Sequence, residues 1–311
     1  MHLDKSPNME MVKKIEYLDS DFEVANPKND FKYPFYLRFV QLFFQVIGRL
    51  APNFAAKVAY KLFTTPRKRA VHKVSDEWIE SARVFEFMYG REMLKGYEWG
   101  NGDRVVLLVH GWESRGTAMR TFVPHLLEQG FRVVTFDGPA HGHSAGSRTN
   151  LIHFAGALKA IVKQIGTVHS IIAHSFGGPV TVFAMSKMEP SFQIKKLVLV
   201  GAPDRVELAM ANTLETLRLP NPVYRKFRAK IEKLLEVPIE EVAVQQLSRH
   251  LQIEDVLVVH DEQDDVVPVE AAYRMFEHWS NASLLLSKGY GHYLLMKNPD
   301  LLERVTQFII R

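Results

Sequence analysis

A serine in a turn of small residues is the feature of this sequence that points most directly to chemistry. Ser175 follows the apolar pair Ile171-Ile172 and precedes Gly177 and Gly178, after which a helix is predicted to begin at Pro179. A serine on a sharp strand-to-helix turn needs small neighbours, because its backbone lies close to the flanking residues. The turn also directs a backbone N–H and the helix N-terminus toward charge that develops beside the hydroxyl. The pattern indicates a nucleophilic serine.

Three further motifs follow predicted strands and contain the groups that such a serine requires. His110-Gly111-Trp112 closes the apolar run Val105 to Val109, and Asp264 lies in a turn after the run Val256 to Val259. His292 lies beside Gly291, behind the last predicted strand. An imidazole with a carboxylate partner is the usual base for a serine nucleophile, so these residues are candidates for one site.

These motifs, in this order, resemble those of the α/β-hydrolase superfamily over about residues 82 to 311. The nucleophile elbow of that family is Gly-x-Ser-x-Gly, and here Ala173 replaces the first glycine. The family's Asp-x-Pro-Gly-His-Gly-x-Ser loop is matched from Asp137 to Ser144. In its His-Gly-x-x-Asp-x-x-Val-Pro motif, Asp261 occupies the glycine position, and we expect Asp261 and Asp265 to face solvent.

The resemblance implies a role for each residue of the site. Ser175, His292 and Asp264 are expected to form the catalytic triad, and the backbone N–H groups of Trp112 and Phe176 the oxyanion hole. The implied chemistry is two-step acyl transfer through a covalent acyl-enzyme. No metal, nucleotide or organic cofactor is needed for any step.

Other polar residues near these motifs have mainly structural interpretations. Asp137, His141 and His143 are a plausible ligand set for a metal, but the family match explains them without one. His174 and His260, like His141, are expected to shape or support the pocket. Asp204, after an earlier strand, is a minor alternative to the triad acid.

The implied reaction is hydrolysis of a small-molecule carboxylic ester with an apolar acyl or alkyl group. Trp112, Tyr290 and Tyr293 are the expected substrate contacts because they are aromatic and adjoin the motifs. Thioesterase or acyltransferase activity, C–C bond hydrolysis, and a non-catalytic binding protein remain alternatives. Glu113, beside the predicted oxyanion hole, either pairs with Arg115, faces solvent or disfavours anionic substrates.

The elements that must position these residues alternate between short apolar runs and helical stretches, which is typical of a mostly parallel sheet covered by helices. We predict an α/β-hydrolase fold with an eight-stranded sheet. Residues 82–203 and 253–311 form the core, residues 204–252 insert a helical lid, and residues 1–81 form an N-terminal helical extension.

Composition excludes several function classes. The 311-residue chain contains no cysteine, so disulfide scaffolds, thiolate metal sites and cysteine nucleophiles are impossible. Residues 31–75 hold nine Lys or Arg and no Asp or Glu; since the net charge is +4, the rest of the chain carries about −5. The basic character therefore belongs to one segment, which argues against a nucleic-acid partner for the whole domain.

Two amphipathic stretches occupy this basic segment. Polar residues Arg38, Gln41, Gln45 and Arg49 recur at helical spacing, opposite a broad apolar face. We expect both helices to pack their apolar faces on the main domain; the alternative is peripheral contact with lipid through residues 35–73. The N-terminus lacks the pattern of a secretory signal, so the expected location is the cytoplasm, with a membrane surface as the alternative.

Overall fold

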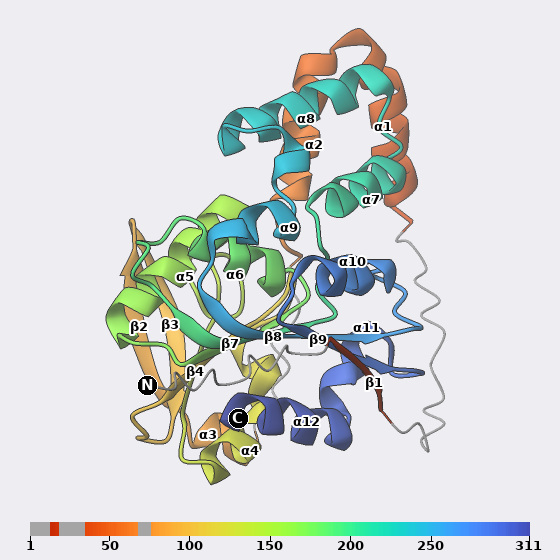
Figure 1. Ribbon diagram of the computed structural model, residues 1–311. Helices are drawn as coiled ribbons and strands as arrows, with labels where there is room; N and C mark the ends of the chain where they lie inside the picture. The colour runs from red at the N-terminus through yellow and green to blue at the C-terminus, as the bar shows by residue number, and fades with distance from the viewer. Residues whose placement is uncertain (1–12, 19–34, 68–75) are drawn as a thin grey trace, which may run out of the picture.

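One nine-stranded sheet organises the molecule, and the computed structural model describes residues 13–18, 35–67 and 76–311 (Figure 1). Pairs β2–β3 and β3–β5 are antiparallel, and all other neighbours are parallel. The strands, in their order across the sheet, are β1 (Lys14–Tyr17), β9 (Ala282–Ser287), β8 (Ile253–Asp261), β7 (Ile194–Val200), β6 (Ser170–His174), β4 (Val105–Val109), β5 (Arg132–Phe136), β3 (Glu92–Trp99) and β2 (Arg83–Tyr89).

The α/β-hydrolase fold is confirmed, but the predicted number of strands was too low. All eight predicted strands are present, and β1 adds a ninth at the edge, parallel to β9. The N-terminal extension is therefore not purely helical. The strand was missed because it has only four residues, with the charged Lys14 and Glu16 at alternate positions, and three of the four are exposed. Such an edge strand lacks the apolar run that marks a buried one.

Alternating side chains of the central strands face two helical layers. Val106 and Leu108 of β4 pack in one buried cluster, and Leu107 and Val109 pack in the other, as a period of two requires. Figure 1 shows α5, α6 and α10 on one face of the sheet and α4 and α12 on the other. Their bounds are α4 (Val123–Glu128), α5 (Leu151–Ile165), α6 (Gly177–Met185), α10 (Glu270–His278) and α12 (Pro299–Ile310).

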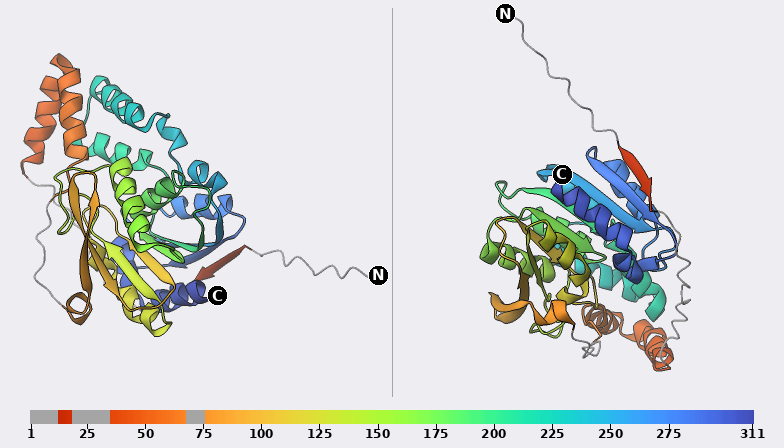
Figure 2. Two further views of the ribbon diagram at one scale, coloured as in Figure 1. Left: turned by 90° about the vertical axis from the view of Figure 1, so that its left-hand side faces the viewer. Right: turned by 90° about the horizontal axis from the view of Figure 1, so that it is seen from below.

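Four helices from two distant parts of the chain form a projecting unit, called the cap here (Figures 1 and 2). They are α1 (Leu37–Leu50), α2 (Pro52–Phe63), α7 (Glu207–Leu217) and α8 (Asn221–Leu235). Helix α7 and helix α8 lie between β7 and β8, where the insertion was predicted, followed by the short α9 (Val244–Leu247). That this segment acts as a lid stays a prediction. Among the described residues, no helix has the length and apolar content to cross a bilayer.

Helix α1 packs differently from the expected arrangement. Its polar residues Gln41 and Gln45 face α7 and the residue that follows it, donating hydrogen bonds to the carbonyl oxygens of Thr216 (2.9 Å) and Arg218 (2.6 Å). Much of the apolar face points outward instead, while Phe44 is buried against the cap. The expectation that α1 packs its apolar face on the main domain is therefore wrong, because the helix packs on α2, α7 and α8.

Candidate active site

Ser175 lies on a strained turn between β6 and α6. Its φ angle is 53°, in the left-handed region that non-glycine residues rarely adopt. The turn is possible because its neighbours are small: a Cβ added to Gly177 would lie 2.4 Å from the carbonyl oxygen of Val109, and one added to Gly111 would lie 2.8 Å from Cβ of Ser175. Ala173, which departs from the elbow pattern, is fully buried in the core without disturbing the strand.

The structure joins Ser175, His292 and Asp264 in one chain of hydrogen bonds. His292 lies on α11 (Gly291–Leu294), after β9, and Asp264 lies in the loop after β8. Nδ1 of His292 donates to Oδ2 of Asp264 at 2.7 Å, so Nε2 is the unprotonated nitrogen and accepts from Oγ of Ser175 at 2.9 Å. The base is therefore in the tautomer that can take the serine proton.

The carboxylate of Asp264 is held in place from its other side. Oδ1 accepts the backbone N–H groups of Val266 and Val267, each at 2.8 Å. Burial would raise the pKa of Asp264, but the hydrogen bond and charge interaction with His292, and the N–H of Val267, outweigh it and lower the pKa. An ionised carboxylate at this position favours the protonated form of His292, which is what the predicted role of Asp264 requires.

Asp261 links the loops of the candidate site in a way that the sequence did not predict, and the expectation that it faces solvent is wrong. Its side chain is fully buried. Its carboxylate accepts hydrogen bonds from four groups: Oγ of Ser287 (2.7 Å), N of Gln263 (2.9 Å), N of Tyr290 (3.0 Å) and N of Gly289 (3.3 Å). Asp261 thus ties the loop that carries Asp264 to the loop that carries His292. The signal that could have revealed its burial is that Asp261 occupies a position where the family motif has glycine.

Two buried histidines brace the same loops, as expected for structural residues. Nε2 of His174 donates to the backbone oxygen of His292 at 3.1 Å, and Nε2 of His260 donates to that of Val267 at 2.8 Å. Burial, together with the nearby His292, lowers the pKa of His174 to about 3. Burial also lowers the pKa of His260. Both rings therefore stay neutral and serve as fixed hydrogen-bond donors.

The predicted oxyanion hole adjoins Ser175. Among the hydrogen bonds of the described residues, the N–H groups of Trp112 and Phe176 donate none, so both remain available to a ligand. The Trp112 and Phe176 rings meet edge to face at 5.6 Å between centroids. His110 supports the turn, because its Nδ1 donates to the oxygen of Gly111 and its Nε2 accepts N–H of Gly138. The role of the Trp112 and Phe176 N–H groups as oxyanion donors stays a prediction.

Glu113 pairs with a residue of the N-terminal extension. Arg67, just after α2, donates to both carboxylate oxygens of Glu113, with Nη2 to Oε2 at 2.7 Å and Nε to Oε1 at 2.9 Å. The backbone N–H of Glu113 donates to Nε2 of His141 at 3.0 Å. The bidentate pair therefore connects the segment that follows α2 to the residue next to Trp112. No sequence pattern marks this pair, because the two residues are 46 positions apart.

Of the three predicted substrate contacts, Trp112 and Tyr293 lie near Ser175 or His292, and Tyr290 is buried in the core. Trp112 is half-buried beside Phe176, and Tyr293 is 47% exposed with its ring 5.0 Å from that of His292. Tyr290 instead packs in the hydrophobic cluster with Leu295 and Met296, where its ring is almost fully buried. Its predicted contact with substrate therefore has no support in the packing.

The alternative roles weighed for other acidic residues have structural explanations. Asp204 accepts hydrogen bonds from Arg274 (2.7 Å) and Arg205 (3.0 Å), so its carboxylate is engaged outside the triad. Asp137 accepts N–H of Gly116 and the hydroxyl of Tyr97. Within the described part of the chain, no group of three metal-ligating side chains is placed to hold an ion.

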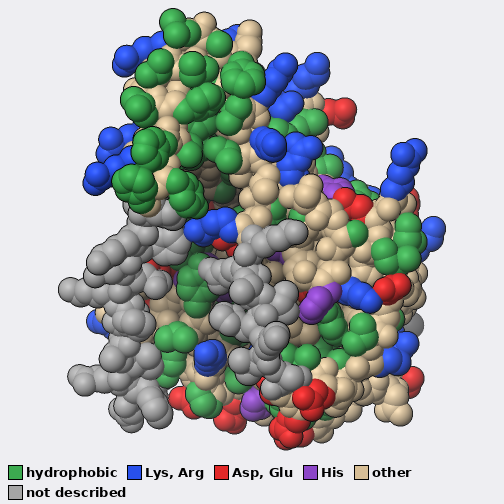
Figure 3. Space-filling view, turned by 180° about the vertical axis from the view of Figure 1, so that it is seen from behind, with side chains coloured by type: hydrophobic (Ala, Val, Ile, Leu, Met, Phe, Trp, Pro, Cys, Tyr) green, Lys and Arg blue, Asp and Glu red, His purple; other side chains and the backbone are tan. Residues whose placement is uncertain are grey.

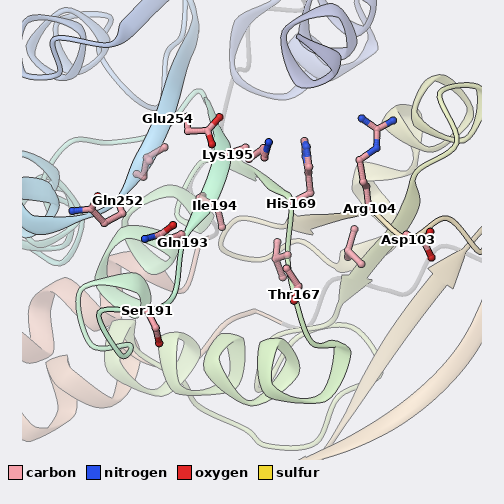
Figure 4. A pocket seen from close by; sticks show the side chains of 13 residues that line it. Asp103, Arg104, Thr167, His169, Ser191, Gln193, Ile194, Lys195, Gln252 and Glu254 are labelled. Carbon is pink, nitrogen blue, oxygen red and sulfur yellow. The ribbon is translucent and has the colours of Figure 1, made fainter.

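A cavity of about 610 Å³ opens at the end of the sheet that lies away from Ser175 (Figure 4). It lies at the amino ends of β4, β7 and β8, and Arg104, His169 and Lys195 are among the residues that line it. Ser175, Asp264 and His292 lie beyond the carboxyl ends of β6, β8 and β9, where ligands bind in open α/β sheets. The cavity therefore belongs to a different part of the molecule from Ser175.

Comparison with known proteins agrees with this architecture. The family model described as "Alpha/beta hydrolase family" matches residues 106–305. The chain belongs to the alpha/beta hydrolase family. This hydrolase is 26% identical over 256 residues to a non-heme chloroperoxidase of Burkholderia pyrrocinia, covering 66% of this chain and 91% of that protein.

Other relatives have different named activities. The hydrolase is 25% identical over 262 residues to the 2-hydroxy-6-oxononadienedioate/2-hydroxy-6-oxononatrienedioate hydrolase of Escherichia coli, covering 68% of this chain and 89% of that one. Its fold is similar to that of an esterase of Pyrococcus furiosus, with a TM-score of 0.61, 21% identity, and coverage of 79% of this chain and 98% of that one. The family model establishes the family, the structural match supports the fold, and the named activities differ among the relatives.

Proposed function

We propose that this alpha/beta hydrolase is a serine hydrolase that cleaves carboxylic esters with an apolar acyl or alkyl group. The hydrogen-bonded chain Ser175–His292–Asp264, with distances of 2.9 and 2.7 Å, is the observation that carries the proposal. Such a chain activates a hydroxyl that is otherwise a weak nucleophile. The half-buried rings of Trp112 and Phe176 beside the serine favour an apolar group on the substrate.

In the proposed mechanism, Oγ of Ser175 attacks the ester carbonyl while its proton passes to Nε2 of His292. The N–H groups of Trp112 and Phe176 bind the oxyanion, each contributing about 3 kcal/mol to stabilisation of the transition state. Protonated His292 then gives its proton to the departing alcohol, which leaves an acyl group on Ser175. Water, deprotonated by His292, attacks this acyl group, and the acid is released with Ser175 restored.

Hydrolysis of graded p-nitrophenyl esters, from acetyl to dodecanoyl, tests this proposal. We expect turnover by the native chain to rise with acyl length beyond acetyl, and Ser175→Ala to abolish it. Asp265→Ala is the matched control, since Asp265 is exposed one residue from the triad acid and should leave turnover unchanged. Absence of turnover on every ester by folded native protein would contradict ester hydrolysis.

C–C bond hydrolysis is the second candidate, favoured by the similarity to the Escherichia coli hydrolase. The same triad serves that reaction if the bond breaks to give a stabilised carbanion, which then takes the proton from His292. A vinylogous diketo acid and an acyl-coenzyme A thioester, assayed beside the esters, separate the candidates by their relative kcat/KM. Preference for the thioester would favour the thioesterase or acyltransferase alternative. If the protein binds these compounds but turns over none of the three classes, a non-catalytic binding protein is favoured.

A further inference from the structure

The cap presents a continuous apolar surface to solvent, which is called the outer face here. On α1 and just before it, the exposed apolar side chains recur every three or four residues, which places them on one side of the helix. They are Phe35 (76% exposed), Phe39 (60%), Leu42 (59%), Val46 (49%) and Leu50 (79%). Single exposed apolar residues are common on protein surfaces, whereas a stripe of five marks an interaction site.

The orientation of α1 shows that this exposure is specified by packing. Gln41 and Gln45 donate hydrogen bonds into the cap, which holds the polar side of the helix inward. Turning the helix to bury Phe39 and Leu42 would break both bonds. The surface extends to α2, because Phe54 is 56% exposed and its ring lies 6.3 Å from that of Phe43.

Basic side chains border the outer face, and the local sequence contains no acid. Arg38 and Arg49 are exposed on α1, and Lys57 and Lys61 are exposed on α2. Residues 31–75 hold nine Lys or Arg and no Asp or Glu, while the rest of the chain carries about −5. Figure 3 shows the apolar surface on the cap with Lys and Arg side chains along its edges.

We propose that the outer face docks the cap onto an anionic lipid surface. Helices with Phe and Leu on one side and cations beside them lie in the interface of a bilayer, with the apolar side chains among the acyl chains and the cations at the headgroups. Among the described residues, the side chains that border the outer face carry positive charge only, so a surface with negative headgroups is complementary to it. The cap projects away from the sheet, so a flat surface can reach the outer face (Figures 1 and 2). This proposal does not depend on which bond Ser175 cleaves.

Flotation of the full chain with vesicles tests the proposal. We expect binding to vesicles of phosphatidylcholine with phosphatidylglycerol, weaker binding to phosphatidylcholine alone, and loss of the difference at high salt. Replacing Phe39→Ser and Leu42→Ser together should lower the partition coefficient about a hundredfold. Replacing Arg38→Glu and Arg49→Glu should lower binding to the anionic vesicles only.

The matched control replaces two exposed apolar residues elsewhere, Val84→Ser and Met88→Ser on the edge strand β2, which are 52% and 53% exposed. This variant should bind vesicles like the native chain. All the substituted side chains are exposed, so the variants should fold, which circular dichroism and thermal unfolding can verify. The proposal fails if the native chain ignores anionic vesicles, if the Phe39/Leu42 variant binds as tightly as the native chain, or if light scattering shows a second copy of the chain covering the outer face.

Discussion

Replacement of the buried Asp261 by alanine should weaken both the fold and the activity. The carboxylate accepts four hydrogen bonds, at 2.7 to 3.3 Å: one from Ser287 at the end of β9 and three from backbone N–H groups in the loops that carry Asp264 and His292. A hydrogen bond to a charged group contributes about 1.5–3 kcal/mol, but neighbouring contributions are not additive and water can enter the space. We therefore expect Asp261→Ala to lower the free energy of unfolding by about 3–5 kcal/mol.

The effect of Asp261→Ala on activity follows from the backbone N–H groups that lose their acceptor. The N–H groups of Gly289 and Tyr290 lie within three residues of His292, so the loss of their hydrogen bonds allows the imidazole to shift relative to Ser175. A displacement of about 1 Å in a catalytic group can cost about a hundredfold in rate. The expected result is a fall in kcat of about that size with little change in KM, measured below the unfolding temperature on a p-nitrophenyl ester.

Urea unfolding and steady-state kinetics of three variants test this reasoning. Asp265→Ala, in the same loop but exposed, should match the native chain in both measurements. Asp261→Asn keeps one acceptor oxygen and should fall between native and alanine, which provides a folded variant if Asp261→Ala does not fold. Native stability and native kcat in Asp261→Ala would refute the assigned role.

Three shorter predictions concern other parts of the site. Gly111→Ala should lower kcat and melting temperature together, because its Cβ would lie 2.8 Å from Cβ of Ser175; a native kcat would contradict the close packing. The pKa of His174 is about 3 in the folded chain, compared with its usual value of 6.5 in the unfolded chain. Between these pH values the unfolded chain binds more protons, so the free energy of unfolding of the native protein should fall as the pH drops. His174→Gln should lessen this fall by up to about 1.4 kcal/mol per pH unit in urea titrations, and an unchanged slope would contradict it. Arg67→Ala should change stability by less than about 1 kcal/mol, since Arg67 is mostly exposed, yet lower kcat/KM by releasing Glu113 beside Trp112; equal kcat/KM would argue against that coupling.

The sequence was most informative where short-range chemistry determines structure. Strands such as β4 and β6 were predictable because they are fully buried apolar runs, which few other structures accommodate. Ser175, Asp264 and His292 were identifiable because each follows a strand, and parallel strands end at one edge of the sheet. Their hydrogen-bonded arrangement is present in the structure, and their catalytic roles stay predictions.

Features that depend on long-range packing were not predictable. The pairing of Arg67 with Glu113 and the burial of Asp261 require knowledge of which loops meet in space. Helix α1 has a clear amphipathic pattern, but the pattern does not say which side the rest of the protein covers. Here Gln41 and Gln45 found partners inside the cap, and the apolar side faces outward.

Covalent labelling of Ser175 by a fluorophosphonate probe tests the central claim most directly, because the probe reports an activated serine whatever the natural substrate. The site is located by mass spectrometry of the labelled peptides. We predict one label per native chain, on Ser175, no label in Ser175→Ala, and labelling at least about a hundredfold slower in His292→Ala. A folded native chain that stays unlabelled, or that is labelled as fast in His292→Ala as in the native form, would contradict the account.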